Sequence, residues 1–256
     1  MSGSQRCESL FLPQNLHISE KSSNFALANI SKIMRAIFIN GSPRKNKNTA
    51  QMLESAMKGA QEAGAEVEMI HLTSLNYKGC VSCMACKRTG NTCGGLCIQK
   101  DDLRPVLEKI LAADMLVCGS PIYWHNSTGM FRNFIERLFF PILSYNNADE
   151  NGAIKYLNKK MPCGVIYTMN VTPEYYEHFH YHEILEPVRR QMESFFGYCE
   201  QLEARNTWQF YPDYSKFDAR AVDMEQKQWY RDNQWPKDLQ AAYDLGKRLV
   251  EKAKEE

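Results

Sequence analysis

Short apolar runs alternate with longer amphipathic stretches along most of this chain. The first apolar run, residues 36–39, is rich in β-forming side chains and ends at Asn40-Gly41-Ser42-Pro43, which is typical of a strand followed by a turn. Apolar residues then recur at helical spacing, at Met52, Leu53, Ala56, Met57 and Ala60. The beginning of the pattern therefore predicts a strand, a loop and a helix.

The same alternation continues toward the C-terminus. Further strands are predicted at 66–71, 115–120, 163–169 and 199–207, and further helices at 103–111, 130–139, 183–196 and 236–254. The stretches 146–152 and 170–181 are predicted as polar and aromatic loops. Strands that alternate with helices at this spacing form a parallel sheet that is covered on both faces. We therefore expect a doubly wound α/β fold with five parallel strands in the order 2-1-3-4-5.

In this strand order, the loops after the first, third and fourth strands meet at the carboxyl edge of the sheet. The first of these loops precedes a helix, so free backbone N–H groups and the positive end of the helix dipole face it. Its side chains add donors that suit phosphate oxygens, namely Ser42, Arg44, Asn46, Asn48 and Thr49. The loop predicts an anion site, and a terminal phosphate monoester suits it best.

Two common phosphate loops do not match. A Walker A loop needs a second glycine followed by Lys-Ser/Thr, whereas this chain has Asn46-Lys47-Asn48. A Rossmann fingerprint needs three glycines at fixed spacing, and Gly41 stands alone. The alternative that stays open is an ordinary turn whose Ser, Asn and Thr side chains cap the helix.

The amino-acid composition and the net charge exclude several classes of protein. The chain has 256 residues, of which 44% are hydrophobic and 24% charged, as expected for one globular domain with or without appendages. The net charge of +1 offers no basic surface for nucleic acid. The apolar runs are well short of the ~18 residues of a membrane span, so no membrane contact is expected. The polar N-terminus has no secretory signal, which predicts a cytoplasmic location.

Five of the nine cysteines lie between Cys80 and Cys97. In a reducing compartment, such crowding favours metal or redox chemistry over a disulfide framework. The spacing Cys80-x₂-Cys83-x₂-Cys86-x₆-Cys93 lets a short loop hold one cluster or one ion. A structural Zn²⁺ on four of the five thiolates and free thiols at a subunit contact remain alternatives. The other cysteines are predicted to be small buried hydrophobic residues: Cys7, Cys118, Cys163 and Cys199.

Two loops resemble those of a known family. Asn-Gly-Ser-Pro-Arg-Lys-Asn-x-Asn-Thr-Ala at 40–50 resembles the first FMN-binding loop of the flavodoxin-like NAD(P)H-dependent FMN reductases, and especially of their relatives, the iron–sulfur flavoproteins. Ser-Pro-Ile-Tyr at 120–123 and Phe-Ile-Glu-Arg at 134–137 are similar to the same family's second flavin loop and its helix. The resemblance covers roughly 34–207 and implies a flavodoxin-like fold with FMN as cofactor.

The resemblance also implies site residues. It implies that the FMN phosphate is held by Ser42, Arg44, Asn46, Asn48 and Thr49. It implies that the flavin ring is lined by Pro121, Ile122, Tyr123 and Trp124, and its pyrimidine edge by Thr168, Met169 and Asn170. The pair His125-Asn126 departs from the small residues that the family has at this place. Without the first loop, Tyr123 and Trp124 would be interpreted as packing aromatics.

The cysteine loop resembles the compact [4Fe–4S] motif of the iron–sulfur flavoproteins. That resemblance implies Cys80, Cys83 and Cys86 as ligands, with Cys93 as the fourth ligand in the spacing above. Cys97 is the alternative fourth ligand, because it stands before Ile98-Gln-Lys-Asp101-Asp102, where the family has its last cysteine. Related FMN reductases keep the first three cysteines without a cluster, so the loop is also compatible with no cluster.

A histidine-rich segment, His178-Phe-His180-Tyr-His182-Glu183, offers further metal ligands. Alternate residues share a face on a strand, and no strand is predicted here. The preferred interpretation is a polar, aromatic loop over the mouth of the site.

The expected domain organisation has three parts. Residues 1–33 are predicted to be a loosely attached, poorly ordered extension. Residues 34–207 form the flavodoxin-like FMN-binding domain, with the cysteine loop at 76–102. Residues 208–256 supply an aromatic segment and a helix that pack on the core or on a subunit partner.

The predicted function is that of an FMN-dependent oxidoreductase that takes hydride from NAD(P)H and reduces a quinone, a flavin or another small acceptor. No catalytic acid or base is predicted, because the flavin performs the chemistry. One alternative is an iron–sulfur flavoprotein that carries electrons to a redox protein partner. An alternative of another class is a Zn-stabilised, non-enzymatic regulatory module. We expect a homodimer or homotetramer.

Overall fold

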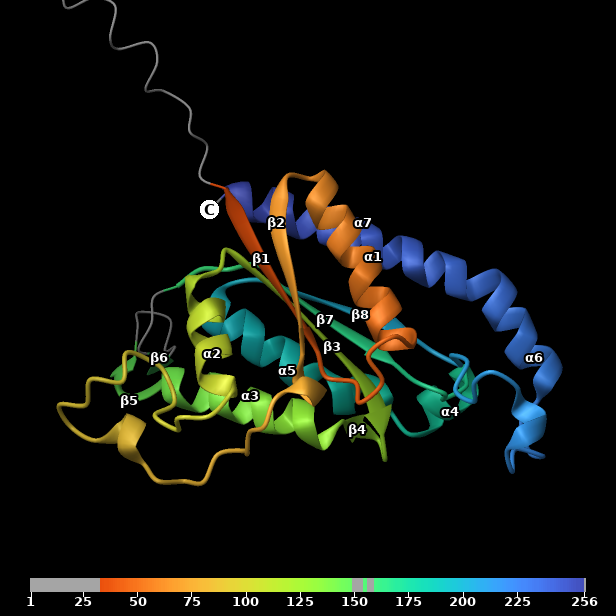
Figure 1. The fold of residues 1–256 in the computed structure, drawn as a ribbon, viewed down its shortest axis with the longest axis horizontal. Coiled ribbons are helices and arrows are strands. Elements are labelled where there is room, and N and C mark those ends of the chain that lie inside the picture. The colour runs from red at the N-terminus through yellow and green to blue at the C-terminus, as the bar shows by residue number, and fades with distance from the viewer. Residues whose placement is uncertain (1–32, 149–153, 156–158, 256) are drawn as a thin grey trace, which may run out of the picture. The chain divides into compact units, whose positions relative to one another are not determined.

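Five parallel strands form the centre of the computed structural model, which describes residues 33–148, 154–155 and 159–255 (Figure 1). The strands are β1 (Met34–Asn40), β2 (Ala65–His71), β3 (Met115–Tyr123), β7 (Cys163–Thr168) and β8 (Cys199–Ala204). They are paired in the order β2-β1-β3-β7-β8, and every pair is parallel. The predicted order 2-1-3-4-5 is therefore confirmed, since the intervening labels belong to short additional strands.

The additional strands form two local hairpins. β4 (Asn126–Ser127) pairs antiparallel with the end of β3. β5 (Leu143–Ala148) pairs antiparallel with β6 (Ile154–Lys155) in a separate small sheet. The prediction of a polar loop from residue 146 is wrong up to Ala148, because pairing with β6 satisfies the backbone of a segment whose side chains show no strand pattern. The rest of that loop lies outside the described residues, as do residues 1–32.

Two helices cover one face of the sheet, α1 (Asn48–Glu62) and α7 (Trp235–Glu255). Ala36 and Phe38 of β1 point into the core beneath them. The two helices touch through glycines. A Cβ atom at Gly246 would lie 1.9 Å from the carbonyl oxygen of Ala56, and one at Gly59 would lie 2.0 Å from that of Tyr243. Their backbones are therefore in direct contact.

Three helices cover the opposite face: α2 (Leu103–Ala112), α3 (Gly129–Ile142) and α5 (Tyr181–Phe196). Ile37 and Ile39 of β1 point to this side, alternating with the residues that face α1. Both faces of the sheet are thus buried, and the expectation of a doubly wound fold is confirmed (Figure 1).

Some connections are more helical than predicted. The aromatic stretch 170–181, expected as a loop, contains α4 (Pro173–His178), and α5 begins at Tyr181. Thr172 caps α4 by accepting from the Tyr175 N–H at 3.4 Å, and proline at the first helical position is a known start signal. The C-terminal helical region begins before 236, with α6 (Met224–Trp229) and the π-helical turn η4 (Tyr230–Gln234) running into α7.

Short 3-10 turns complete the fold at η1 (Leu72–Ser74), η2 (Ala85–Lys87) and η3 (Tyr214–Lys216). None of the helices in the described part of the chain is both long enough and apolar enough to cross a membrane.

Candidate functional site

Asn40 shapes the loop that follows β1. Its Oδ1 accepts from the Ser42 N–H at 2.9 Å, and its Nδ2 lies 3.0 Å from Nδ1 of His71. Burial, together with the positive charge of Lys45, lowers the pKa of His71. The imidazole is therefore neutral at neutral pH and can accept from the Asn40 amide. Sequence reasoning treated Asn40 as punctuation and missed this role, because the partner on β2 is distant in the chain.

The N-terminus of α1 is buried and has no side-chain cap. Lys47 occupies the capping position without such a bond, and Asn48 and Thr49 are 7% and 2% exposed. The first N–H groups of a helix need acceptors, so this end suits a bound anion that also meets the positive end of the dipole. The alternative of an ordinary turn with a side-chain cap is not what the structure has.

Hydrogen bonds tie the loops after β1, β3 and β7 together. The Gly41 N–H donates to the Gly119 carbonyl at 2.8 Å, and the Thr128 hydroxyl donates to the Gly41 carbonyl at 2.7 Å. The hydroxyl oxygens of Thr49 and Thr168 lie 2.7 Å apart. Gly41 has no room for a side chain, because a Cβ atom would lie 2.9 Å from Phe131. The predicted convergence of these loops is confirmed.

Most of the predicted site residues line one cleft between these loops. They are Ser42, Arg44, Asn48, Thr49, Pro121, Ile122, Tyr123, Thr168, Met169 and Asn170. Lys47, Thr207 and Gln209 also line the cleft and were not predicted. The cleft has a volume of about 40 Å³.

Asn46 and Trp124 are not among the residues that line the cleft. Trp124 is 95% exposed. It forms, with His125, the two-residue turn between β3 and β4, and both residues have positive φ, +47° and +63°. Such a turn is typical of a tight hairpin, and it carries the indole into solvent. The usual sequence signal for it, Asn-Gly, is missing here.

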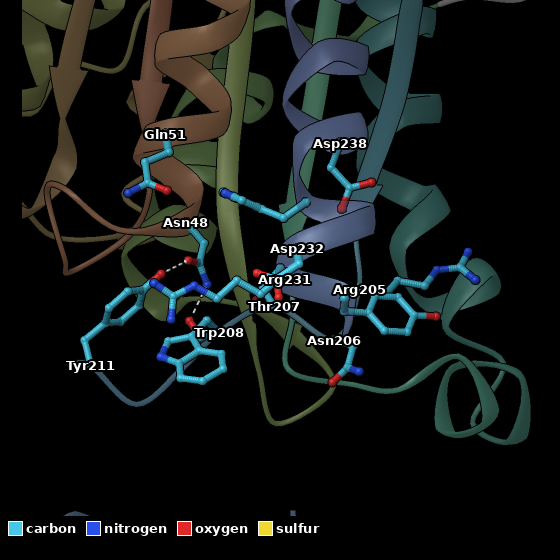
Figure 2. A pocket seen from close by; sticks show the side chains of 12 residues that line it. Asn48, Gln51, Arg205, Asn206, Thr207, Trp208, Tyr211, Arg231, Asp232 and Asp238 are labelled. Atoms are coloured by element: carbon cyan, nitrogen blue, oxygen red, sulfur yellow. Dashed lines mark hydrogen bonds between the residues drawn. The ribbon is translucent and has the colours of Figure 1, made fainter. Parts of the chain in front are cut away.

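The segment 208–211 covers the loop after β1 and the start of α1. Arg44 Nη1 donates to the Gln209 carbonyl and Asn48 Nδ2 to the Trp208 carbonyl, both at 2.8 Å. The Tyr211 hydroxyl donates to Asn48 Oδ1 at 2.7 Å, and Figure 2 shows Asn48 between these two partners. The side chains of Arg44 and Asn48 therefore hold this segment in place.

A second cavity of about 280 Å³ shares Asn48 and Thr207 with the lining of the cleft (Figure 2). Its lining is aromatic and charged, and the guanidinium of Arg231 lies 4.6 Å from the ring centre of Trp208. Burial raises the pKa of Asp238, although the Gln234 amide donates to it at 2.8 Å. The predicted aromatic segment thus builds a cavity together with α1 and α7.

A third cavity of about 500 Å³ meets the cleft at Asn170, which lines both. Tyr175, Phe179 and Tyr181 give it an aromatic wall, and the rings of Tyr175 and Phe179 stack with centroids 5.9 Å apart. Lys227 of α6 also lines it. Its volume is within the ~300–1,000 Å³ of sites for small molecules.

The cysteine loop brings four thiols to one small cavity. Cys80, Cys83, Cys86 and Cys97 line about 20 Å³ of space beside Arg137 of α3. Cys93 is not part of this lining, and its Sγ lies 3.9 Å from the Ala85 carbonyl. The thiols are not close enough for a single ion, since no group of three cysteines among the described residues has its sulfur atoms within 4.8 Å of one another.

Arg137 anchors both ends of this loop. Its fully buried guanidinium forms a two-point ion pair with Asp101 and donates to the carbonyls of Lys78 and Gln99, at 3.1 and 3.4 Å. Burial alone would raise the pKa of Asp101, but the hydrogen bonds and charge of Arg137 outweigh it and lower that pKa. In the middle of the loop, the ammonium of Lys87 donates to the carbonyls of Phe140 and Leu143 at the end of α3.

The other described cysteines are buried, as predicted. Cys118 and Cys163 are fully buried, and Cys199 is 5% exposed. Burial raises the pKa of Cys118 and that of Cys199, the latter to about 12. The thiols of Cys118 and Cys199 therefore stay protonated, and all three side chains are packed as small hydrophobic residues. Cys7 lies outside the described residues.

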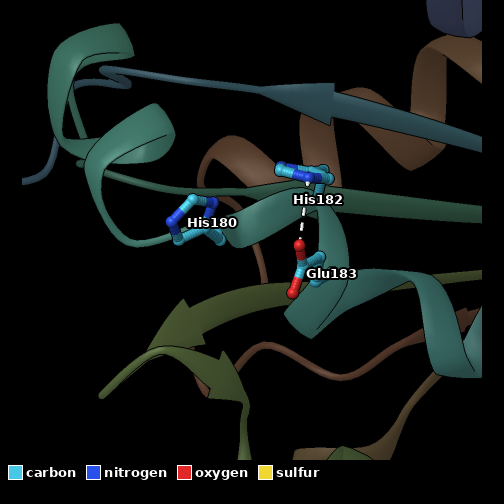
Figure 3. A group of neighbouring side chains, drawn as sticks. All are labelled: His180, His182 and Glu183. Atoms are coloured by element: carbon cyan, nitrogen blue, oxygen red, sulfur yellow. Dashed lines mark ion pairs between the residues drawn. The ribbon is translucent and has the colours of Figure 1, made fainter.

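His180, His182 and Glu183 gather at the start of α5 (Figure 3). Their ligand atoms lie within 4.8 Å of one another, and His182 Nε2 is 3.7 Å from Glu183 Oε1. The argument that alternate residues here cannot share a face is wrong, because His180 has a φ of +51° and turns the chain before the helix begins. All three are exposed. Imidazole and carboxylate groups form a candidate ligand set for a divalent transition metal.

The strand order and the helices on both faces define a class of protein, the flavodoxin-like α/β proteins. The sequence profile of the NADPH-dependent FMN reductase family matches residues 34–162. The chain belongs to this family.

Similar curated proteins are named iron–sulfur flavoproteins. One from Archaeoglobus fulgidus is 42% identical over 104 residues, which is 41% of this chain and 48% of that protein. One from Methanosarcina thermophila is 28% identical over 104 residues, 41% of this chain and 52% of that protein. The chain thus spans about half the length of the curated relatives that it matches.

Solved structures share the fold. An NAD(P)H:quinone oxidoreductase from Methanothermobacter marburgensis is similar with a TM-score of 0.59 and 17% identity, over 85% of this chain and 96% of that one. An azoreductase from Bacillus anthracis is similar with a TM-score of 0.55 and 15% identity, over 84% of this chain and 100% of that one. At these identities, the likeness shows the fold alone.

Proposed function

We propose that the protein is an FMN-dependent oxidoreductase that takes a hydride ion from NADPH or NADH and passes two electrons to a quinone, a flavin or another small acceptor. The observation that carries the proposal is the buried N-terminus of α1, which has no side-chain cap and lies in the cleft between the loops after β1, β3 and β7. Family membership supports FMN as the group whose phosphate enters it.

The residues of the cleft suit the parts of FMN in turn. The hydroxyls of Ser42 and Thr49 and the first N–H groups of α1 are donors for a phosphate. An isoalloxazine would lie near Tyr123 and Asn170, where the cavity of about 500 Å³ adjoins the cleft. The donor set and the adjoining cavity together fit FMN.

Bound FMN would accept the hydride and return the electrons one or two at a time. The protein would bind FMN and exclude water from its phosphate. The segment 208–211, which is fixed by Arg44 and Asn48, closes the loop from outside. No residue is assigned as a catalytic acid or base.

The phosphate assignment is tested by the double variant Ser42→Ala/Thr49→Val. Each lost hydrogen bond to a charged group is worth about 1.5–3 kcal/mol, so FMN affinity is expected to fall by about tenfold or more per hydroxyl. Ser194→Ala, at an exposed serine of α5, serves as the matched control and keeps the wild-type affinity. Unchanged FMN retention in the double variant would contradict the assignment.

The hydride donor is tested by anaerobic mixing of the FMN-loaded protein with NADPH or NADH. The flavin absorption bands are expected to bleach with one or both donors and to return when a quinone is added. Bands that persist with both donors, in protein that demonstrably holds FMN, would leave the protein as a flavin carrier without this activity.

A second candidate function is electron transfer through an iron–sulfur cluster on the cysteine loop. The four thiols around one cavity favour it, and they point to Cys97 rather than Cys93 as the fourth ligand. Similar proteins named iron–sulfur flavoproteins also support it. The donor set suits a [4Fe–4S] cluster, and Cys83 is its exposed member.

Iron and acid-labile sulfide in anaerobically purified protein test this candidate. We expect both to be present in wild type and in Cys93→Ser, and both to be lost in Cys97→Ser. If iron and sulfide are lost in Cys93→Ser and retained in Cys97→Ser, the fourth ligand is Cys93 instead of Cys97. Zinc without sulfide would support the structural zinc site instead.

A further inference from the structure

Lys227 of α6 is a buried cation that has no carboxylate partner within the described part of the chain. Its side chain is 2% exposed. Its ammonium donates to Asn170 Oδ1 at 2.5 Å, to Asn206 Oδ1, and to the carbonyls of Asn206 and Thr207 at 3.2 and 3.3 Å. Every one of these acceptors is neutral. Among residues 33–145 and 159–255, no ion pair compensates this charge.

Burial destabilises the charged form of a lysine side chain because it removes the ammonium from water. Desolvation lowers the pKa of Lys227 to about 8, so the ammonium still predominates at neutral pH but is destabilised. An uncompensated buried charge of this kind is costly to the fold. A nearby anion would reverse that cost, and Lys227 lies in the lining of the cavity that adjoins the cleft.

Asn170 links Lys227 to the cleft. A lysine ammonium is a donor and has no acceptor, so Asn170 has to turn its Oδ1 toward Lys227 and its Nδ2 away. No acceptor for that Nδ2 is found in the described part of the chain. Asn170 lines both the cleft and the larger cavity. The amide is thus held as a donor for a ligand and is polarised by the charge behind it.

The neighbouring contacts keep Lys227 in place. Asp223 caps α6 by accepting from the Gln226 N–H at 2.9 Å, and Asn206 Nδ2 donates to Gln226 Oε1 at 3.3 Å. Asn206 therefore has both ends of its amide engaged, in contrast to Asn170. The ammonium is fixed between the end of β7, the end of β8 and α6.

We propose that Lys227 is a positioning residue which, through Asn170, supplies positive charge to the flavin site and thereby favours reduction of the bound flavin. The inference rests on the proposed FMN site. Two electrons and one proton convert neutral oxidised flavin to an anion, so a fixed cation beside the ring binds the reduced form more tightly than the oxidised form. Charge complementarity of this kind raises the reduction potential.

The test is the two-electron reduction potential of FMN-loaded protein, measured anaerobically by spectroelectrochemistry. In Lys227→Met we expect reduced FMN to lose about 10- to 100-fold in affinity relative to oxidised FMN. This is a fall of about 30–60 mV, at 29.6 mV per tenfold for a two-electron couple. Lys227→Arg, which keeps the charge, and Lys237→Met, at an exposed lysine of α7, are expected to keep the wild-type potential.

Lys227→Gln is the second neutral variant, because its amide can still donate to Asn170 or Asn206 and so spares the fold. A potential that is unchanged in a neutral variant with FMN bound overturns the inference and leaves the FMN site intact. A wild-type protein that does not bind FMN overturns the proposed function instead. The wild type alone gives an independent reading by NMR of the Lys227 ammonium. Its pKa is expected to rise when the bound flavin is reduced, and an equal pKa in both states overturns the inference.

Discussion

At the scale of single residues, the ion pair of Arg137 and Asp101 decides how the cysteine loop is attached to the core. The guanidinium is fully buried and the carboxyl is 20% exposed. Removal of one partner from such a pair leaves a buried charge and costs about 3–5 kcal/mol. We expect Asp101→Asn to lower the free energy of unfolding by that amount, as measured by urea denaturation. Asp218→Asn, at a carboxylate that is 92% exposed, is the control and changes it by less than about 0.5 kcal/mol.

The same pair predicts a pH dependence. The pKa of Asp101 is lower in the folded protein than its ordinary value, because Arg137 outweighs the effect of burial. The stabilisation is therefore complete above the unfolded pKa, near 4, and is lost as the pH falls through the lower folded pKa. The difference in unfolding free energy between wild type and Asp101→Asn is expected to shrink below about pH 4. A difference that stays constant down to the acid transition would contradict this account.

Lys227 predicts a trend at alkaline pH in protein without FMN. Its folded pKa of about 8 lies below the ordinary value of 10.5. The cost of holding the charge is thus fully present below pH 8, and it disappears as the pH rises to about 10.5. Relative to Lys227→Met, the wild type should gain stability across that range in urea titrations. No relative gain would show that the buried ammonium is not destabilised.

Sequence reasoning found the residues whose roles are local and missed those that depend on distant partners. Ser42 and Thr49 are recognisable because a hydroxyl beside a helix start is a signal in itself. Lys227 gives no signal, since its partners Asn170 and Asn206 lie in the loops after β7 and β8, far from it in the chain. Trp124 was expected at the flavin ring because the sequence shows that its side chain is aromatic. The sequence does not show the positive φ that turns this side chain outward.

At the scale of elements, the contact between α1 and α7 is the tightest constraint on the C-terminal helix. Gly246→Ala would place a Cβ atom 1.9 Å from the Ala56 carbonyl oxygen. The helices would have to separate, at a cost of about 3 kcal/mol or more, which is a fall in Tm of roughly 6–12 °C. Gly129→Ala, where nothing lies within 4 Å of the added Cβ atom, is the matched control. Equal Tm values for both variants would contradict the backbone contact.

Periodicity located the long strands and helices because their apolar residues face a core. It did not find β5, whose pairing with β6 satisfies the backbone without an apolar pattern. It also missed α4, although Thr172-Pro173 carries the signals of a cap and a first helical residue. In short elements, capping residues therefore indicate a helix as well as hydrophobic periodicity does.

At the scale of the whole molecule, the order of the strands was predictable because crossovers are right-handed and parallel strands need helices on both faces. Residues 33–256 form one compact unit. A shortened chain that begins at Met34, the first residue of β1, is expected to bind FMN with unchanged affinity and to melt at nearly the wild-type temperature. Loss of FMN binding on shortening would show that residues 1–33 contribute to the site.

The closure of the cleft could not be read from the sequence, since it depends on the segment 208–211 folding back onto Asn48 and Arg44. Contacts between segments that are so far apart in the chain depend on tertiary packing, and local sequence patterns do not reveal them. The cleft and the cavities of about 280 and 500 Å³ could not be read from the sequence either, because their lining residues come from strands and helices far apart in the chain.

The most direct measurement is a fluorescence titration of the flavin-free protein with FMN and with riboflavin, which differ by the phosphate. If the buried N-terminus of α1 holds that phosphate, FMN should bind about a hundredfold more tightly than riboflavin, a difference of about 2.8 kcal/mol. The preference should fall in Ser42→Ala/Thr49→Val. Equal affinity for FMN and riboflavin in the wild type would contradict the account.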